Sequence, residues 1–164
     1  MLRPDAHGGG AGRVLTISMS TLVHAPRERV WRALTDPAEV VRWDERVLGL
    51  RGTADGYPSA GHAVHWRYRV GSVPLDLSEQ ALEVVPLQRL RLARSFASLR
   101  FEETFSLGDE GDPSSTRLSL RLAVRNSVPT LGGALDRFDV RRFASELVDE
   151  SLRGLQRWCE QQAP

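Results

Sequence analysis

The sequence predicts an α+β protein in which one curved antiparallel sheet of about seven strands wraps around a long C-terminal helix. Three observations predict this architecture. Apolar and polar residues alternate in several segments between positions 15 and 124, which is the pattern of strands with one buried face. Signals for two short helices follow the first of these strands. A long amphipathic helical stretch begins near Val140.

Length and composition indicate one globular domain. A chain of 164 residues can bury a sufficient core without disulfides or metals. With 41% hydrophobic and 26% charged residues, it has the balance of an ordinary globular protein. We expect a single domain over residues 13–164, after a disordered tail, residues 1–12, that is too rich in glycine to offset its ordering entropy. The single cysteine, Cys159, excludes an internal disulfide, and we expect no metal and no cofactor.

Charge and hydropathy argue against two classes of partner. The net charge is only +1, and acidic residues separate the basic ones, so the chain lacks the clustered basic sequence of a nucleic-acid binder. Charged residues interrupt every apolar run before the ~20 residues that a membrane span needs. The N-terminus lacks the apolar segment of a secretory signal, which predicts a cytoplasmic protein. All basic residues are arginine, which excludes Schiff-base chemistry on lysine.

The first strand and the two short helices are predicted by residues 14–43. Alternation over residues 14–23 indicates a strand. Pro26 suits the first turn of a helix, because its φ is fixed near the helical value. Asp36, with proline directly after it and glutamate three residues on, forms a cap from which a second short helix starts. We expect Trp31 to be buried where the first helix docks.

The segment up to residue 125 contains only strand and turn signals. Thr116–Val124 is the clearest strand, with leucines on one face and arginines on the other. Leu99–Leu107 repeats the alternation. In the fourth strand of the sheet the apolar phase changes, from Leu75 and Leu77 to Leu82 and Val84. We therefore predict a β-bulge at Glu79–Ala81 that curves the sheet.

The longest helix ends near the C-terminus. From Val140 onward its apolar residues, including Phe143, Leu147 and Leu155, share one broad face. We expect that face to lie against the concave side of the sheet. Two glycines precede the helix, so we expect Ser127–Phe138 to form one side of the entrance to the interior and to be more mobile than the helix.

A motif near the N-terminus resembles a known superfamily. The stretch from Val23 to Pro37, VHAPRERVWRALTDP, followed by Trp43, is similar to the opening of the START-related lipid-transfer and polyketide cyclase superfamily, also called SRPBCC. The resemblance extends from Leu15 to about Glu160. It implies the helix-grip fold of the birch pollen allergen, with a ligand cavity between the sheet and the C-terminal helix. Members include polyketide cyclases, lipid and hormone binders and co-chaperone-like proteins, and the motif selects none of these.

Glu103 is the first candidate for a functional residue. Alternation places it between Phe101 and Phe105 on the inner face, beside Leu120 of the next strand. A carboxyl group there would be desolvated, which raises its pKa and suits it to general acid catalysis or to anchoring a ligand hydroxyl or amine. Two alternatives remain: a bulge that exchanges Glu102 with Glu103, or a structural ion pair with an arginine.

Other polar candidates share the inner phase. Tyr68 offers a hydroxyl to the interior, and His62 has the same phase near the start of that strand. Arg94 follows two inward leucines and can either clamp an anion at the cavity mouth or extend into solvent. His65 projects to the other face, so it cannot share a metal with His62. The expected ligand-binding residues are Trp66, Arg94, Phe101, Phe105, Leu120, Phe143 and Leu147.

Two functions fit these residues. The first is binding of a small, mainly hydrophobic molecule, and the second is a polyketide cyclase, aromatase or dehydratase in which Glu103, Tyr68 or His62 moves protons. We favour the first, because the expected interior is poor in acid–base pairs. Polar side chains within hydrogen-bond reach deep in the interior would favour the second. A co-chaperone-like module would need an exposed apolar patch, which the outward arginines oppose. The residues identify neither the ligand nor the oligomeric state.

Overall fold

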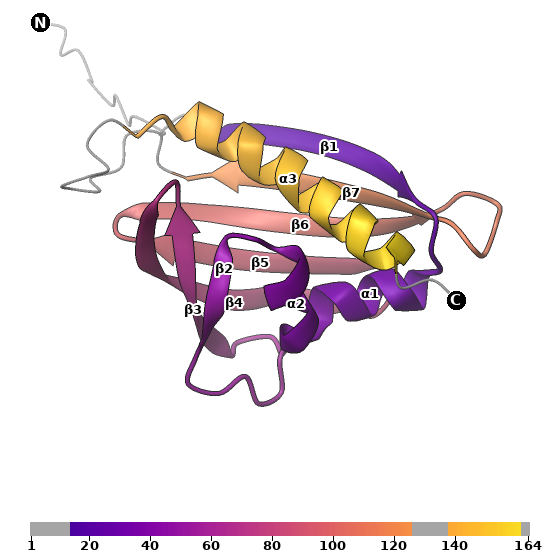
Figure 1. Cartoon of the computed structure of the whole chain (residues 1–164), viewed down its shortest axis with the longest axis horizontal. Helices are drawn as coiled ribbons and strands as arrows, with labels where there is room; N and C mark the ends of the chain where they lie inside the picture. The colour runs from indigo at the N-terminus through magenta and orange to yellow at the C-terminus, as the bar shows by residue number, and fades with distance from the viewer. Residues whose placement is uncertain (1–13, 126–137, 162–164) are drawn as a thin grey trace, which may run out of the picture.

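A computed structural model describes residues 14–125 and 138–161, which form one antiparallel sheet and three helices (Figure 1). The strands are β1 (Leu15–Val23), β2 (Val47–Arg51), β3 (Ala63–Val70), β4 (Val73–Val85), β5 (Arg89–Phe96), β6 (Leu99–Asp109) and β7 (Thr116–Val124). The helices are α1 (Arg27–Thr35), α2 (Pro37–Trp43) and α3 (Val140–Gln161). The predicted α+β architecture, with its seven strands, two short helices and long C-terminal helix, is confirmed.

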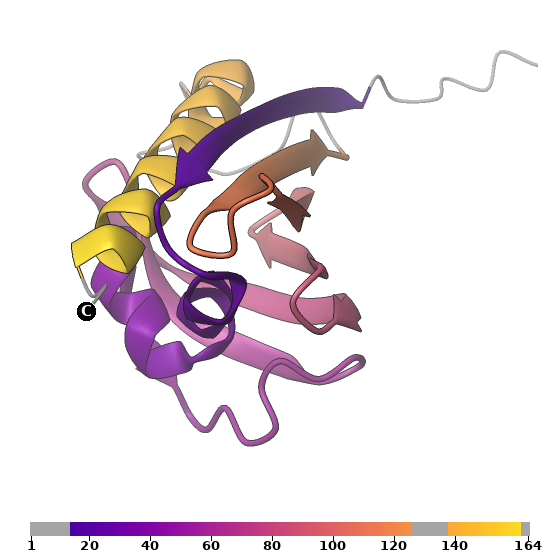
Figure 2. The ribbon, with the colours of Figure 1, turned by 90° about the vertical axis from the view of Figure 1, so that its right-hand side faces the viewer.

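The strand order shows how the chain encloses its interior. The sheet runs β1-β7-β6-β5-β4-β3-β2, so the first two strands of the sequence lie at opposite edges. Helices α1 and α2 connect these edges. The sheet curves strongly, and α3 lies along its concave side (Figure 2). Helix α3 contacts β1 and β7 as well as both short helices.

Alternation along the strands produces the buried face. In β3 every second residue from Val64 to Val70 is buried, and the residues between them are exposed. The predicted face of α3 is also confirmed, because Phe143, Leu147 and Leu155 are all buried. Cys159 is buried on the same face, and its burial raises its pKa to about 11. The thiol therefore packs as a small apolar group and not as a nucleophile.

The junction of the three helices differs in part from the prediction. The Asp36 carboxylate accepts a hydrogen bond from the Ala38 N–H at 2.9 Å, as expected of the cap of α2. Trp31, however, is only partly buried, so that prediction is wrong. It stands at the side of the buried stripe of α1, whose members are Arg29, Val30, Ala33 and Leu34. The buried tryptophan is Trp43, whose indole N–H donates to the Ala33 carbonyl at 2.8 Å.

The predicted bulge in β4 is present, but further along the strand. The register against β5 shifts between Ala81 and Glu83 and not at Glu79–Ala81. Glu79 consequently keeps the phase of Leu77 and lies buried on the concave face. Leu82, which we expected to face inward, is 39% exposed.

Some predictions concern residues that the structure does not describe. The proposed tail, residues 1–12, and the proposed entrance segment up to residue 137 both lie outside the described ranges. Within those ranges, no helix is both long and apolar enough to cross a membrane.

Candidate ligand-binding site

Three charged side chains from neighbouring strands meet on the concave face. Glu79 of β4 stands opposite Arg94 of β5, and Glu103 of β6 stands opposite the residue two positions before Arg94. The Arg94 Nε donates to Glu79 Oε2 at 2.5 Å, and Arg94 Nη1 lies 2.9 Å from Glu103 Oε2. Both carboxylates are fully buried and Arg94 is 6% exposed. We call Glu79, Arg94 and Glu103 the buried triad.

The protonation of the triad follows from its burial. Desolvation, assisted by the negative charges of Glu79 and Asp44, raises the pKa of Glu103 to about 7 despite the opposing charge of Arg94. Burial alone would lower the pKa of Arg94, but Glu103 and Glu79 outweigh it and hold that pKa well above its usual value. Arg94 therefore stays charged, while Glu103 gains and loses a proton near neutral pH.

Asp44 adds a third carboxyl group to this region. It follows α2 directly, is 5% exposed and accepts a hydrogen bond from the Arg46 backbone N–H at 3.1 Å. Burial raises its pKa, although the nearby charge of Arg94 opposes that rise. In the described part of the chain, three carboxyl groups, those of Glu79, Glu103 and Asp44, thus act on the buried guanidinium of Arg94.

Several polar atoms around the triad lack a hydrogen-bond partner within the described part of the chain. They are Glu79 Oε1, both carboxylate oxygens of Glu103, the Tyr68 hydroxyl and the Trp66 indole nitrogen. The Arg94–Glu103 contact is an ion pair without hydrogen-bond alignment. Since buried polar groups in folded proteins almost always have a partner, these five atoms need an explanation.

Aromatic side chains form the apolar surroundings of these atoms. Trp66 packs edge-to-face with Tyr57 at 6.0 Å between ring centroids. The ring centroids of Phe96 and Phe101 both lie within 6 Å of the ring centroid of Phe143 on α3. The contacts of Phe143 place apolar surface between the sheet and α3, and Phe101 stands opposite Arg94 of the triad.

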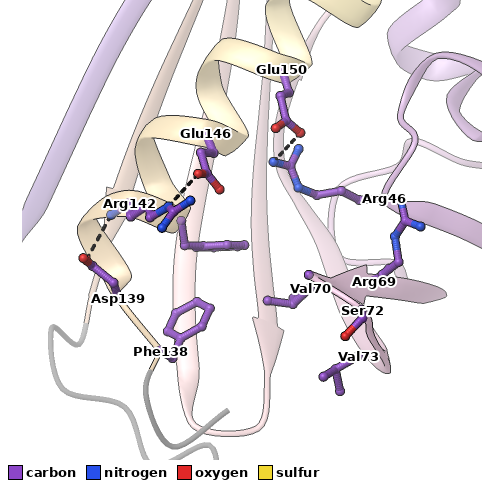
Figure 3. Close-up of a pocket in the computed structure, with 12 residues that line it drawn as sticks. Arg46, Arg69, Val70, Ser72, Val73, Phe138, Asp139, Arg142, Glu146 and Glu150 are labelled. Atoms are coloured by element: carbon purple, nitrogen blue, oxygen red, sulfur yellow. Dashed lines mark hydrogen bonds and ion pairs between the residues drawn. The ribbon is translucent and has the colours of Figure 1, made fainter. Parts of the chain in front are cut away.

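An open crevice of about 530 Å³ lies between the β3–β4 turn and the first turns of α3 (Figure 3). Its apolar lining includes Val70, Val73 and Phe143. Charged side chains surround this lining: Arg46, Arg69, Asp139, Arg142, Glu146 and Glu150. An ion pair between Arg46 and Glu150, at 2.7 Å, joins the segment after α2 to α3.

Arg46 connects the crevice with the interior. Its side chain is only 13% exposed. Burial raises the pKa of Tyr68 well above its usual value, and the charge of Arg46 opposes that rise. The same charge opposes the rise in the pKa of Glu103. Arg46 therefore lines the crevice and also acts electrostatically on Tyr68 and Glu103 in the interior.

The structure brings together most of the side chains singled out from the sequence. The residues that share the buried concave side are Trp66, Tyr68, Arg94, Phe101, Glu103, Phe105, Leu120, Phe143 and Leu147. Of these, Phe143 lines the crevice. Glu102 faces outward and pairs with Arg91 and Arg125, so no bulge exchanges it with Glu103.

Two sequence-based placements are wrong. His62 lies in an exposed turn before β3 begins, because the chain turns at Gly61, where φ is 83°, and the strand alternation does not yet apply. Arg94 neither extends into solvent nor stands free at a cavity mouth, because two buried carboxylates hold it inside. The described residues contain no group of three or more His, Cys, Asp or Glu side chains placed to hold a metal ion.

Sequence reasoning missed Glu79 and Asp44. The signal for Glu79 was available, since it continues the alternation of Leu75 and Leu77, but the misplaced bulge hid it. Asp44 follows a helix of seven residues and belongs to no periodic pattern. Its burial depends on how α2 docks, which no local pattern predicts.

Comparison with known proteins agrees with this geometry. Residues 14–160 match the family described as "Polyketide cyclase / dehydrase and lipid transport". The chain belongs to this family. The match covers β1 through nearly all of α3, so the polyketide cyclase and lipid transport family accounts for the whole sheet and the helix along it. No curated protein matches the chain.

Solved structures show the same fold at low sequence identity. A START superfamily protein from Mycobacterium smegmatis superposes with a TM-score of 0.71 at 18% identity, over 90% of this chain and 99% of that chain. A protein from Thermus thermophilus gives 0.68 at 23% identity, over 92% and 100%. A protein from Rhizobium loti gives 0.67 at 20% identity, over 89% and 97%. At these identities the likeness shows the fold alone.

Proposed function

We propose that this protein binds a small, largely apolar molecule between the sheet and α3, with a polar group of the ligand at the buried triad. The observation that carries the proposal is the set of five buried polar atoms, on Trp66, Tyr68, Glu79 and Glu103, that lack a described protein partner. A site that holds an apolar molecule and orients it through a few polar groups has this composition. Membership of a family described by lipid transport and polyketide cyclisation supports the same conclusion.

The crevice supports a route to this site. It borders the interior at Val70 and Phe143, which are both buried core residues. Arg46 and Glu150, which both line the crevice, form an ion pair in which Arg46 is 13% and Glu150 is 58% exposed. Glu150 is exposed enough to turn into solvent when a ligand enters, whereas the mostly buried Arg46 would stay at the crevice wall.

A second candidate function is acid–base catalysis of the cyclase or dehydratase kind. The observation that favours it is the contact of Glu103 with Arg94 deep in the protein, together with the pKa of about 7 of Glu103. We expected an interior poor in such groups, and the structure differs. A general acid works best when its pKa lies near the operating pH. If the protein is an enzyme, Glu103→Gln should abolish turnover while substrate still binds.

The binding proposal is tested with Nile red, a neutral apolar dye whose emission rises in an apolar site. We expect a saturable 1:1 titration with the wild-type protein. Val73→Arg places a charge in the crevice and should weaken dye binding at least tenfold, because a charge opposes entry of an apolar molecule. Val41→Arg makes the same change on the exposed side of α2 and should bind the dye like wild type. A linear, non-saturating titration, or equal effects of the two variants, would contradict the proposal.

A further inference from the structure

The buried triad has an excess of negative charge. Glu79 and Glu103 share the single guanidinium of Arg94, and the charge of Asp44 also acts on that guanidinium. The groups that face Glu103 come from five parts of the chain: Arg94 from β5, Glu79 from β4, Tyr68 from β3, Tyr57 from the segment between β2 and β3, and Asp44 with Arg46 from the segment after α2. The Tyr57 hydroxyl also stands near Glu79, to which it can donate. Arg46 already pairs with Glu150, so its charge is shared with the crevice.

The atoms that lack partners are mainly acceptors. Three of the five are carboxylate oxygens, one on Glu79 and two on Glu103. The Tyr68 hydroxyl can donate or accept, and the Trp66 indole N–H can only donate. A protonated amino group has three N–H donors and one positive charge, and it therefore matches both the acceptors and the charge excess.

We propose that the ligand is an amphipathic amine, with an apolar body between the sheet and α3 and a protonated amino group that donates hydrogen bonds to Glu103 and Glu79. This inference rests on the proposed ligand-binding function. A ligand carboxylate or phosphate would add negative charge beside two desolvated carboxylates, while Arg94 is already occupied by both of them. The site therefore discriminates against fatty acids and phospholipids of similar apolar length.

Proton exchange at Glu103 makes amine binding depend on pH. With a pKa of about 7, Glu103 is mostly protonated at pH 6 and mostly ionised at pH 8. An alkylammonium group, like a lysine side chain, remains protonated at both pH values. Amine binding should therefore strengthen about tenfold from pH 6 to pH 8, in proportion to the ionised fraction of Glu103. Binding of a neutral alcohol should change little.

The test compares three probes of equal chain length, decylamine, 1-decanol and decanoic acid, as competitors of Nile red on the wild-type protein. At pH 8 we expect decylamine to bind at least tenfold more tightly than 1-decanol, and decanoic acid to bind most weakly. Glu103→Gln keeps the shape of the side chain and should lower decylamine affinity at least tenfold, with less than threefold change for 1-decanol. Glu102→Gln, which removes the adjacent outward carboxylate, should leave all three affinities unchanged.

The possible failures are distinguishable. If Nile red itself gives no saturable titration, the proposed binding function is overturned. If the dye binds but none of the three probes displaces it, the amine inference is overturned and the binding function remains. If 1-decanol or decanoic acid binds as tightly as decylamine at pH 8, the amine inference is overturned and the binding function remains. If decylamine binds most tightly but with the same affinity at pH 6 and pH 8, or equally to Glu103→Gln, its amino group does not contact Glu103 and the inference is also overturned.

Discussion

At the scale of single residues, Glu103 is a carboxylic acid that the fold holds away from solvent, where its ionised form is disfavoured. The carboxyl group is fully buried, and its ion-pair partner, Arg94, is shared with Glu79. Breaking a buried charge cluster usually costs more than forming it contributes, so such clusters are poor devices for stability alone. The pairing of Glu103 with an arginine, one of the two alternatives left open by the sequence, is therefore present, and a functional role of the triad stays a prediction.

The pKa of Glu103 predicts how stability changes with pH. This pKa is raised from 4.5 in the unfolded chain to about 7 in the folded protein. The stability from this group is therefore complete below pH 4.5 and is lost as the pH rises through 7, because the folded protein holds the proton more tightly. The shift corresponds to roughly 3 kcal/mol. As the pH rises from below 4.5 to above 7, wild type should lose this stability and Glu103→Gln should not. The unfolding free energy of the variant relative to wild type should therefore rise by that amount, as measured by urea unfolding at each pH.

Glu102→Gln is the matched control for this pH series. Two arginines hold the pKa of Glu102 below its usual value despite partial burial, so its contribution is lost only at acidic pH. Its profile should stay parallel to wild type between pH 5 and pH 8. Parallel profiles for Glu103→Gln as well would show that Glu103 is not protonated in the folded protein near neutral pH.

The inward orientation of Glu103 could be predicted, because it depends only on alternation within β6. The alternation in β4 also contained the signal for Glu79, but it required the exact residue of the bulge. An error of two residues there changed which of Glu79 and Leu82 was assigned to the interior. Asp44 and the exposure of His62 depend on loops, where no period applies.

At the scale of elements, the docking of α3 on α2 depends on one glycine. A Cβ atom at Gly154 would lie 2.6 Å from the Trp43 carbonyl oxygen, a backbone atom that cannot move without displacing α2. Glu39 reinforces this junction by accepting hydrogen bonds from Arg29 of α1 and from the Trp158 indole of α3, at 2.6 and 2.8 Å. The three helices therefore form one packed unit.

Gly154→Ala should destabilise the protein although alanine favours helices. The gain in helix propensity is about 1 kcal/mol. The overlap with Trp43 should outweigh it, and we expect a net loss of about 1 to 3 kcal/mol in chemical unfolding. Arg153→Ala, at an exposed neighbouring position, is the control and should change stability by less than about 0.5 kcal/mol. A Gly154→Ala variant as stable as wild type would show that the two helices are not in contact here.

The two tryptophans of the short helices should differ in their contribution to stability. Trp43 is 7% exposed and its indole hydrogen bond is buried, so Trp43→Ala should cost about 3 to 5 kcal/mol. Trp31 is only partly buried, and Trp31→Ala should cost less than half of that loss. Unfolding midpoints of the two variants measure the difference. The reverse order would mean that α1 docks through Trp31 after all.

At the scale of the whole molecule, period-2 alternation organises both surfaces of the sheet. It directs leucines and aromatic rings inward, and it directs arginines that are scattered in the sequence outward, among them Arg67, Arg91 and Arg121. The order of elements, the sheet and the face of α3 were therefore predictable from the sequence. The crevice was not, because it depends on how the β3–β4 turn stands relative to the start of α3.

The exposed apolar side chains do not favour an interaction module. The large ones in the described ranges are spread over β1 with the residue before it, α2, β2 and β4, and they are Val14, Met19, Val41, Leu48 and Leu82. Scattered exposed apolar residues are normal on a protein surface. The buried charges of the triad lie inside the molecule, where the proposed ligand would bind.

The central claim, that a small molecule binds beside the buried triad, is tested most directly by the indole N–H signals of a ¹⁵N-labelled sample titrated with 1-decanol. Trp66 has no described partner for its indole N–H, whereas the Trp158 indole donates to Glu39 far from the sheet interior. Trp66→Phe identifies the Trp66 signal. We predict a saturable shift of the Trp66 signal and an unchanged Trp158 signal. A Trp66 signal that stays constant while Nile red is displaced, or a shift confined to Trp158, would contradict the claim.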